Sequence, residues 1–136
     1  MAEPVTTVIE GDGYSVGSLD GLGEGPGFRK IRNPLGVTAF GINAIVLPPG
    51  YPTRKHFHEH QEETYFVHEG HILITFGDGS KHLLGPGGIA RVAANTVRQL
   101  ENIGDDAAVY VCIGGKDGYV ERDGVQVTDE GEVQAD

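Results

Sequence analysis

Short runs of β-branched and aromatic residues recur along the chain, separated by turns rich in glycine, proline or aspartate-glycine. No window of a dozen residues shows the three- and four-residue apolar spacing of an amphipathic helix. The pattern therefore predicts an all-β sandwich or barrel of short antiparallel strands. The runs that predict strands are VTTVI (5–9), GVTAFGINAIVL (36–47), TYFVH (64–68), HILITF (71–76), KHLL (81–84), IARVAA (89–94) and AAVYVCI (107–113).

Local turn signals indicate where these strands connect. Asp78-Gly79 separates two of the runs and predicts a tight hairpin, because a type I′ turn needs positive φ at its centre. The stretch RDGV (122–125) predicts a last hairpin, and the acidic end beyond Thr128 is expected to fray. Residues 11–27 are too rich in glycine for a good strand and predict an ordered arm or loop.

The length of 136 residues fits a single domain. We expect a barrel over residues 36–113, an N-terminal strand and glycine-rich arm over 1–35, and a C-terminal hairpin with an acidic tail over 114–136. Hydrophobic residues make up 38% of the chain, which is enough for a packed core. Glycine accounts for 22 of the 136 residues, about 16% and roughly twice the usual share, in agreement with many tight turns.

Charge and composition limit the binding partners and the cellular location that the sequence predicts. Ten basic and 20 acidic residues give a net charge of −10 without a basic stripe, so nucleic acid is not an expected partner. No signal-peptide pattern opens the sequence and no apolar run approaches 18 residues, so a cytoplasmic protein without a membrane span is expected. The single cysteine, Cys112, excludes an internal disulfide and lies in an apolar run, where a small buried side chain is the default.

Three of the six histidines, His56, His58 and His60, fall within five residues. Residues two apart on a strand share a face, so His56 and His58 can direct both imidazoles to one point in a barrel interior. Imidazole nitrogen suits manganese, iron, nickel, copper or zinc. A carboxylate after a short turn, Glu62 or Glu63, can complete a set of two histidines and one carboxylate.

The stretch 50–70 resembles the first motif of the cupin family, G-x5-H-x-H-x3–4-E-x6-G, with His56, His58 and Glu63 in the ligand positions. The six-residue spacing to the closing glycine selects Glu63 over Glu62. The resemblance implies a double-stranded β-helix (jelly-roll) barrel with little or no helix, in agreement with the strand pattern.

The stretch LLGPGGIARVAANTVRQLEN (83–102) resembles the second cupin motif, a P-x-G turn followed by a strand and H-x3-N. Pro86 and Gly88 match the turn, and Asn102 matches the final asparagine. Arg98 stands where cupins usually carry their fourth metal ligand, a histidine. Arginine stays protonated and offers a metal no lone pair, so three of the four usual ligands remain.

Two interpretations of Arg98 follow. In the first, His56, His58 and Glu63 bind one divalent transition metal (Mn, Fe, Ni, Zn or Cu). Arg98 is then a substrate-binding residue that clamps an anionic small molecule. In the second, Arg98 occupies the metal position and pairs with Glu63, an attraction of about 4 kcal/mol at roughly 4 Å and an effective dielectric near 20.

Other candidates have weaker support. Tyr65 shares strand parity with Glu63, so its hydroxyl either orients a ligand in the cavity or packs in the barrel wall. The remaining histidines lie outside the motif positions and are expected at the surface or within strands; they are His60, His68, His71 and His82.

The resemblance leaves three functions open, because the cupin fold serves many activities. They are a metal-dependent enzyme with oxygenase- or isomerase-like chemistry on an anionic small molecule, a non-catalytic small-ligand-binding module, and a metal-free structural cupin. The sequence does not decide whether the protein is an enzyme. The resemblance also implies a homodimer, and the apolar strand expected at residues 5–9 suits an exchanged strand that covers a sheet edge.

Overall fold

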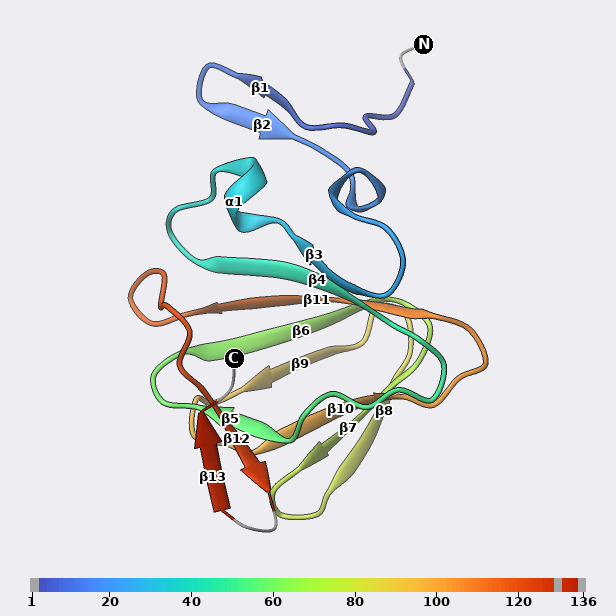
Figure 1. Cartoon of the computed structure of the whole chain (residues 1–136), viewed down its shortest axis with the longest axis vertical. Helices are drawn as coiled ribbons and strands as arrows, with labels where there is room; N and C mark the ends of the chain where they lie inside the picture. The colour runs from blue at the N-terminus through green and yellow to red at the C-terminus, as the bar shows by residue number, and fades with distance from the viewer. Residues whose placement is uncertain (1–2, 129–130, 135–136) are drawn as a thin grey trace.

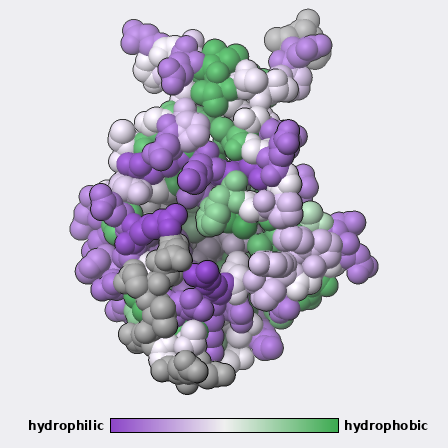
Figure 2. Space-filling view, viewed as in Figure 1, coloured by the Kyte–Doolittle hydropathy of each residue, from purple (hydrophilic) through white to green (hydrophobic). Residues whose placement is uncertain are grey.

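The computed structural model describes residues 3–128 and 131–134. Two antiparallel sheets, one of five and one of six strands, form the barrel, and a separate two-stranded hairpin lies beyond the five-stranded sheet (Figure 1). On the face seen in Figure 2, polar side chains predominate and apolar ones form small patches, one of them near the hairpin at the top. The all-β, double-stranded β-helix prediction is confirmed.

The order of the strands in space differs from their order along the chain. From edge to edge, the five-stranded sheet contains β3 (Gly27–Lys30), β4 (Gly41–Leu47), β11 (Ala108–Gly115), β6 (Glu62–Glu69) and β9 (Ile89–Val92). The six-stranded sheet contains β13 (Gly131–Gln134), β12 (Gly124–Thr128), β5 (His56–His58), β10 (Arg98–Asn102), β7 (Ile72–Phe76) and β8 (Lys81–Leu84). The hairpin contains β1 (Ile9–Gly11) and β2 (Tyr14–Val16).

Helix is limited to two short segments within the described residues, the 3₁₀ turn η1 (Leu19–Leu22) and the single turn α1 (Arg32–Leu35). Neither has the length or apolar character needed to cross a bilayer. Both segments belong to the arm between the hairpin and β4, so the barrel wall itself consists of strands (Figure 1).

The core fills the space between the two sheets, where every second side chain of a strand points inward. Each large apolar side chain buried there contributes roughly 1.5–3 kcal/mol. The buried apolar residues are Ile45, Leu47, Tyr65, Val67, Ile72, Ile74, Val92, Leu100, Ala108 and Tyr110. Two polar residues at opposite ends of β10, Arg98 and Asn102, share this interior with no exposed surface.

Most predicted strands coincide with observed ones. The runs at 64–68, 71–76, 81–84, 89–94 and 107–113 correspond to β6, β7, β8, β9 and β11. The predicted hairpin is confirmed, because β7 pairs with β8 and the connecting Gly79 has a φ of 87°.

The N-terminal predictions were partly wrong. The expected strand at 5–9 is not a strand before Ile9; β1 runs from Ile9 to Gly11 and pairs with β2 inside the segment expected to be a loop. Gly13, with a φ of 83°, makes the tight turn between them. In the run 36–47, only Gly41–Leu47 forms a strand, because Gly36 adopts a left-handed conformation that ends α1.

The C-terminal hairpin was predicted with the wrong turn. β12 starts at Gly124 and pairs with β5 and β13, so RDGV (122–125) enters a strand rather than reversing the chain. A strand, Gly131–Gln134, also lies in the end that was expected to fray; residues 129–130 and 135–136 are outside the described residues. RDGV does not reverse the chain because Asp123 accepts hydrogen bonds from the side chain of His58 and the backbone of His60, in another part of the barrel.

Candidate metal centre

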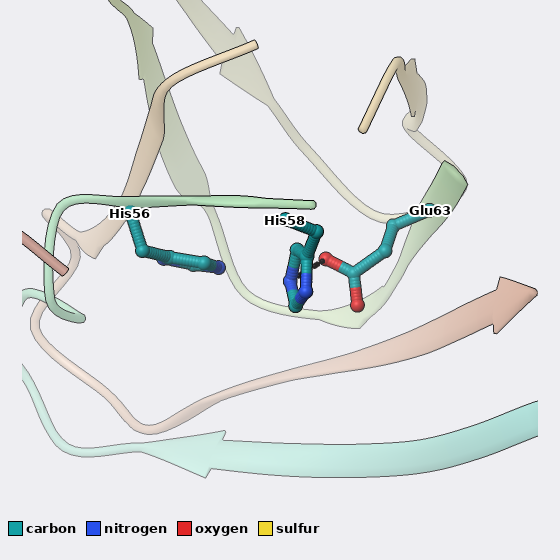
Figure 3. Close-up of side chains that lie close together, drawn as sticks. All are labelled: His56, His58 and Glu63. Carbon is teal, nitrogen blue, oxygen red and sulfur yellow. Dashed lines mark ion pairs between the residues drawn. The ribbon is translucent and has the colours of Figure 1, made fainter. Parts of the chain in front are cut away.

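Facing strands of the two sheets bring two histidines and a glutamate together inside the barrel. β5 carries His56 and His58 on its inner face, and Glu63 lies on β6 of the other sheet. One donor atom from each of the three lies within 4.8 Å of the others. Figure 3 shows the ring of His58 between His56 and Glu63. The structure therefore brings together the three residues that the sequence selected as metal ligands.

His56 presents a free nitrogen to the cluster. Its Nδ1 lies 2.9 Å from the carbonyl oxygen of Arg54, which can only accept, so Nδ1 donates and Nε2 carries the lone pair of the neutral ring. Burial lowers the pKa of His56, as does the positive charge of Arg98, which is paired directly with His56 in the β5–β10 ladder. The ring is held neutral, the form that binds metals.

His58 is held in a similar way by a carboxylate. Its Nδ1 lies 2.7 Å from Oδ1 of Asp123. Its Nε2 lies 3.0 Å from Oε1 of Glu63, but the alignment is not that of a hydrogen bond, so this buried nitrogen has no hydrogen-bond partner among the described residues. Burial lowers the pKa of His58, but the contacts with Glu63 and Asp123 outweigh it, and the pKa is raised overall.

Asp123 is the residue at this site that the sequence did not reveal. Besides His58, its carboxylate accepts hydrogen bonds from the backbone of His60 (2.7 Å), and from the backbone (3.0 Å) and side chain (2.6 Å) of Gln61. Burial opposes ionisation, but the donors of Gln61 and His60, together with His58, lower the pKa of Asp123 to about 2. One carboxylate thus fixes both His58 and the turn that leads to Glu63.

The two oxygens of Glu63 have different surroundings. Oε1 accepts the Tyr65 hydroxyl at 2.6 Å and Nη2 of Arg98 at 2.9 Å. Oε2 accepts only the Cys112 thiol, a weak donor, at 3.1 Å among the described residues. Burial alone would raise the pKa of this carboxyl, but His58, Tyr65 and Arg98 hold it well below the usual range. Glu63 is therefore ionised, with one oxygen firmly held and the other weakly held.

Arg98 has 0% exposure, and its donors are directed into the protein. Nε donates to the Tyr65 hydroxyl at 3.1 Å, and Nη1 donates to the carbonyls of Ala94 (3.1 Å) and Thr96 (2.7 Å). Burial disfavours the charge of Arg98, but Tyr65 and Glu63 raise its pKa overall. The guanidinium is a fixed positive charge behind Glu63; a role for Arg98 or Tyr65 in binding substrate stays a prediction.

These residues fit a divalent metal. Two imidazoles have Nδ1 engaged and Nε2 directed inward, His58 Nε2 is buried without a hydrogen bond, and Glu63 supplies an ionised carboxylate with a weakly held oxygen. Hydrogen bonds from ring nitrogens to a carbonyl and a carboxylate are those that orient metal-binding histidines in general. The charge of Arg98 opposes a cation, but the guanidinium is bound to the other oxygen of Glu63.

Neighbouring candidates lie outside the cluster. Glu62, the alternative carboxylate, is exposed and forms an ion pair with Arg91. Cys112, expected to be a buried apolar side chain, is partly buried, and its thiol donates a hydrogen bond to Oε2 of Glu63. The other histidines are exposed, in agreement with the prediction; they are His60, His68, His71 and His82.

The fold and the cluster together define a small double-stranded β-helix protein with a candidate metal centre inside its barrel. The cupin domain family matches residues 44–114, which is 71 of 136 residues and more than half of the chain. The chain therefore belongs to the cupin family, as its two motifs indicated.

Several solved structures have a similar fold. A cupin protein from Bacteroides fragilis is 27% identical, with a TM-score of 0.67 over 81% of this chain and 90% of that chain. A sugar phosphate isomerase of the cupin superfamily from Silicibacter pomeroyi is 23% identical, with a TM-score of 0.62 over 78% and 73%. The DMSP lyase DddQ from Ruegeria pomeroyi is 20% identical, with a TM-score of 0.59 over 68% and 45%. A search of curated proteins gave no match.

Proposed function

We propose that this cupin binds one divalent transition metal through His56, His58 and Glu63 and thereby binds or transforms an anionic small molecule. The observation that carries the proposal is the state of the two imidazoles. Each has Nδ1 engaged, by the Arg54 carbonyl or by Asp123, so each directs Nε2 toward the cluster that contains Glu63. Manganese, iron, nickel, zinc and copper all suit such a set, and the ligand types do not select among them.

The charges at the site explain why the ligand is an anion. Glu63 and Arg98 carry opposite charges in direct contact, and His56 is held neutral. With both histidines neutral, a bound divalent metal together with Arg98, Glu63 and Asp123 would sum to one positive charge in a largely buried place, which favours an anion. Sugar phosphates, the substrates named for the Silicibacter pomeroyi isomerase, belong to this chemical class.

A bound metal of this kind supplies Lewis-acid or oxygen-activating chemistry, so isomerase- or oxygenase-like reactions are both compatible with it. The protein's own residues position the ligands. Asp123 fixes the ring of His58, and Arg98 with Tyr65 holds one oxygen of Glu63. We propose Arg98 and Tyr65 as the residues that favour a bound anion, Arg98 through its fixed positive charge behind Glu63 and Tyr65 through the hydroxyl that donates to that carboxylate.

A second function is favoured by one specific observation. Arg98 Nη2 lies 2.9 Å from Glu63 Oε1, and the guanidinium has no exposed surface. The pair completes a network with His58 and Asp123 in which every charge has a counter-charge. Under this alternative the protein is a metal-free cupin, either structural or binding a small ligand without chemistry.

Metal content distinguishes the two functions. Protein purified without an affinity tag is expected to contain close to one equivalent of a transition metal by plasma mass spectrometry. The double variant His56→Ala/His58→Ala is expected to lose it, because two of three ligands are gone. The matched control is His71→Ala/His82→Ala, which removes two exposed histidines outside the cluster and should keep the metal. Less than about a tenth of an equivalent in the unaltered protein, unrestored by Mn, Fe, Ni or Zn, would establish the metal-free alternative.

The homodimer prediction concerns the N-terminal hairpin. Strands β1 and β2 pair only with each other among the described strands, and an isolated two-stranded hairpin is marginally stable in water. Their side chains Ile9, Tyr14 and Val16 are exposed. We propose that the hairpin packs against a second copy, so removal of residues 1–16 is expected to convert a dimer into a monomer in light scattering. An unchanged mass, with the circular dichroism of a folded barrel, would show this role to be wrong.

A further inference from the structure

Arg29 is a buried cation on the opposite side of the five-stranded sheet from the metal centre. It is directly paired with Ala44 across the β3–β4 ladder, and Ala44 alternates along β4 with the core residue Ile45. Neighbouring residues along a strand alternate between faces, so Ala44 lies on the outer face. Residues paired across two strands share a face, so Arg29 lies on the outer face as well. It is nevertheless only 7% exposed, because the loop between η1 and β3 lies over it.

The covering loop is fitted closely to the arginine. A Cβ placed on Gly23 would lie 3.2 Å from Cδ and 3.3 Å from Nη1 of Arg29, so a side chain at this position would press on the guanidinium. Two residues further on, the carbonyl of Gly25 accepts a hydrogen bond of 2.7 Å from Nη2. The loop thus fixes the direction of the guanidinium and limits its exposure.

Arg29 has no counter-charge in contact with it. Within the described part of the chain, the Gly25 carbonyl is its only hydrogen-bond partner, and no carboxylate lies within ion-pair distance. The donors on Nε and Nη1 are therefore left without a protein acceptor. Neither nitrogen is completely buried, so both remain reachable from the surface beside an otherwise buried side chain. An anion from outside the chain would supply the missing partner.

Arg29 and Val46 line two hollows on this outer face. The smaller, of about 240 Å³, also contains the carboxylates of Asp20 and Glu69, which repel an anion. The larger, of about 400 Å³, is lined by Pro26, Pro48, Pro49 and Ala107 and contains no acidic side chain. The larger hollow therefore combines one unpaired cation with an apolar wall.

We infer that Arg29 and the larger hollow form a second ligand site, independent of the metal centre, for a small organic carboxylate. The carboxylate pairs with the free donors of Arg29, and an apolar body the size of a benzene ring covers Val46 and the neighbouring prolines. A guanidinium recognises a carboxylate through two parallel N–H donors, and a pocket of a few hundred Å³ accommodates a ligand of this size. A single arginine suits one negative charge better than the two of a phosphate monoester.

Benzoate is the probe for this site, with benzamide as its neutral isostere and acetate and inorganic phosphate as the other arms. In ¹H–¹⁵N spectra of the full chain, benzoate is expected to shift the amide signals of Gly25, Val46 and Ala107 saturably. Benzamide is expected to bind at least about tenfold more weakly, because it lacks the charge that pairs with Arg29. Acetate should bind more weakly than benzoate, because it lacks the apolar body.

The variant Arg29→Gln is expected to weaken benzoate binding at least about tenfold. The matched control is Arg91→Gln, which removes an exposed arginine from the outer face of the same sheet and should leave benzoate binding unchanged. Equal binding of benzoate and benzamide to the unaltered protein would overturn the site without any variant. Saturable binding of phosphate alone would overturn its assignment to an organic carboxylate, and no shift from benzoate at millimolar concentration would overturn the site.

Discussion

Replacing Arg98 with histidine is expected to tighten the binding of a divalent metal by at least about tenfold. The substitution removes a positive charge that repels a cation, an effect of several kcal/mol at about 5 Å and an effective dielectric near 20. It also places an imidazole directly opposite His56 in the β5–β10 ladder, on the same inner face. Competition with a chelator of known affinity measures the change for manganese, nickel or zinc.

The same substitution is expected to destabilise the metal-free protein by about 3 kcal/mol. Glu63 and Tyr65 lose the guanidinium between them, and two backbone carbonyls lose their donor. Breaking a buried ion pair by removing one partner typically costs about 3–5 kcal/mol. Urea unfolding with and without EDTA therefore separates the two effects, since added metal should restore stability to Arg98→His more than to the unaltered protein.

A histidine introduced elsewhere controls for adventitious binding. Arg91→His makes the same exchange at an exposed position on the outer face of β9, outside the cluster, and should leave metal affinity unchanged. Equal metal affinities of Arg98→His and the unaltered protein would contradict the interpretation that Arg98 stands in the position of a fourth ligand. That result would place the guanidinium outside the coordination sphere altogether.

Local patterns predicted the barrel because its strands alternate inward and outward over short runs bounded by strong turns. The segment from β6 to β9 is the clearest case, since turn chemistry such as Asp78-Gly79 marks each boundary. The N-terminal run 5–9 shows the limit of this reasoning. A β-branched run has the propensity for a strand, but whether it pairs depends on the nearest available partner, and here the partner is β2 across Gly13.

The same limit applies to the site. His56, His58 and Glu63 lie within eight residues, so local spacing was enough to single them out, and the structure brings them together. Asp123 reaches His58 only because β12 pairs with β5, a register between segments 65 residues apart that no local pattern specifies. The sequence placed Asp123 in a turn because Asp-Gly usually signals one. In the fold, its carboxylate instead accepts hydrogen bonds from His58 on the distant strand β5 and from the backbone of His60.

Substitution of Asp123 is expected to show how much the metal centre depends on this distant residue. In Asp123→Ala, His58 loses the acceptor of its Nδ1 proton, and the amides of His60 and Gln61 lose theirs. Removing a carboxylate that orients a metal-binding histidine typically lowers metal affinity about 10- to 100-fold. Because buried donors are left without acceptors, the free energy of unfolding should also fall by about 3 kcal/mol.

A spectroscopic measurement distinguishes positioning from general destabilisation. Ring ¹⁵N shifts of His58 report which nitrogen carries the proton, and in metal-free Asp123→Ala they should show loss of the preference for Nδ1–H. The matched control Glu121→Ala removes an exposed acid two residues away with the same change of charge, so it should alter neither the shifts nor metal affinity. If Asp123→Ala lost stability but kept both the His58 shifts and the metal affinity, the carboxylate would serve only to fasten the C-terminal strand to the barrel. Loss of all three together would instead mean that Asp123, which directly precedes β12 and lies outside the segment shared with the cupin family, belongs to the metal centre of this protein.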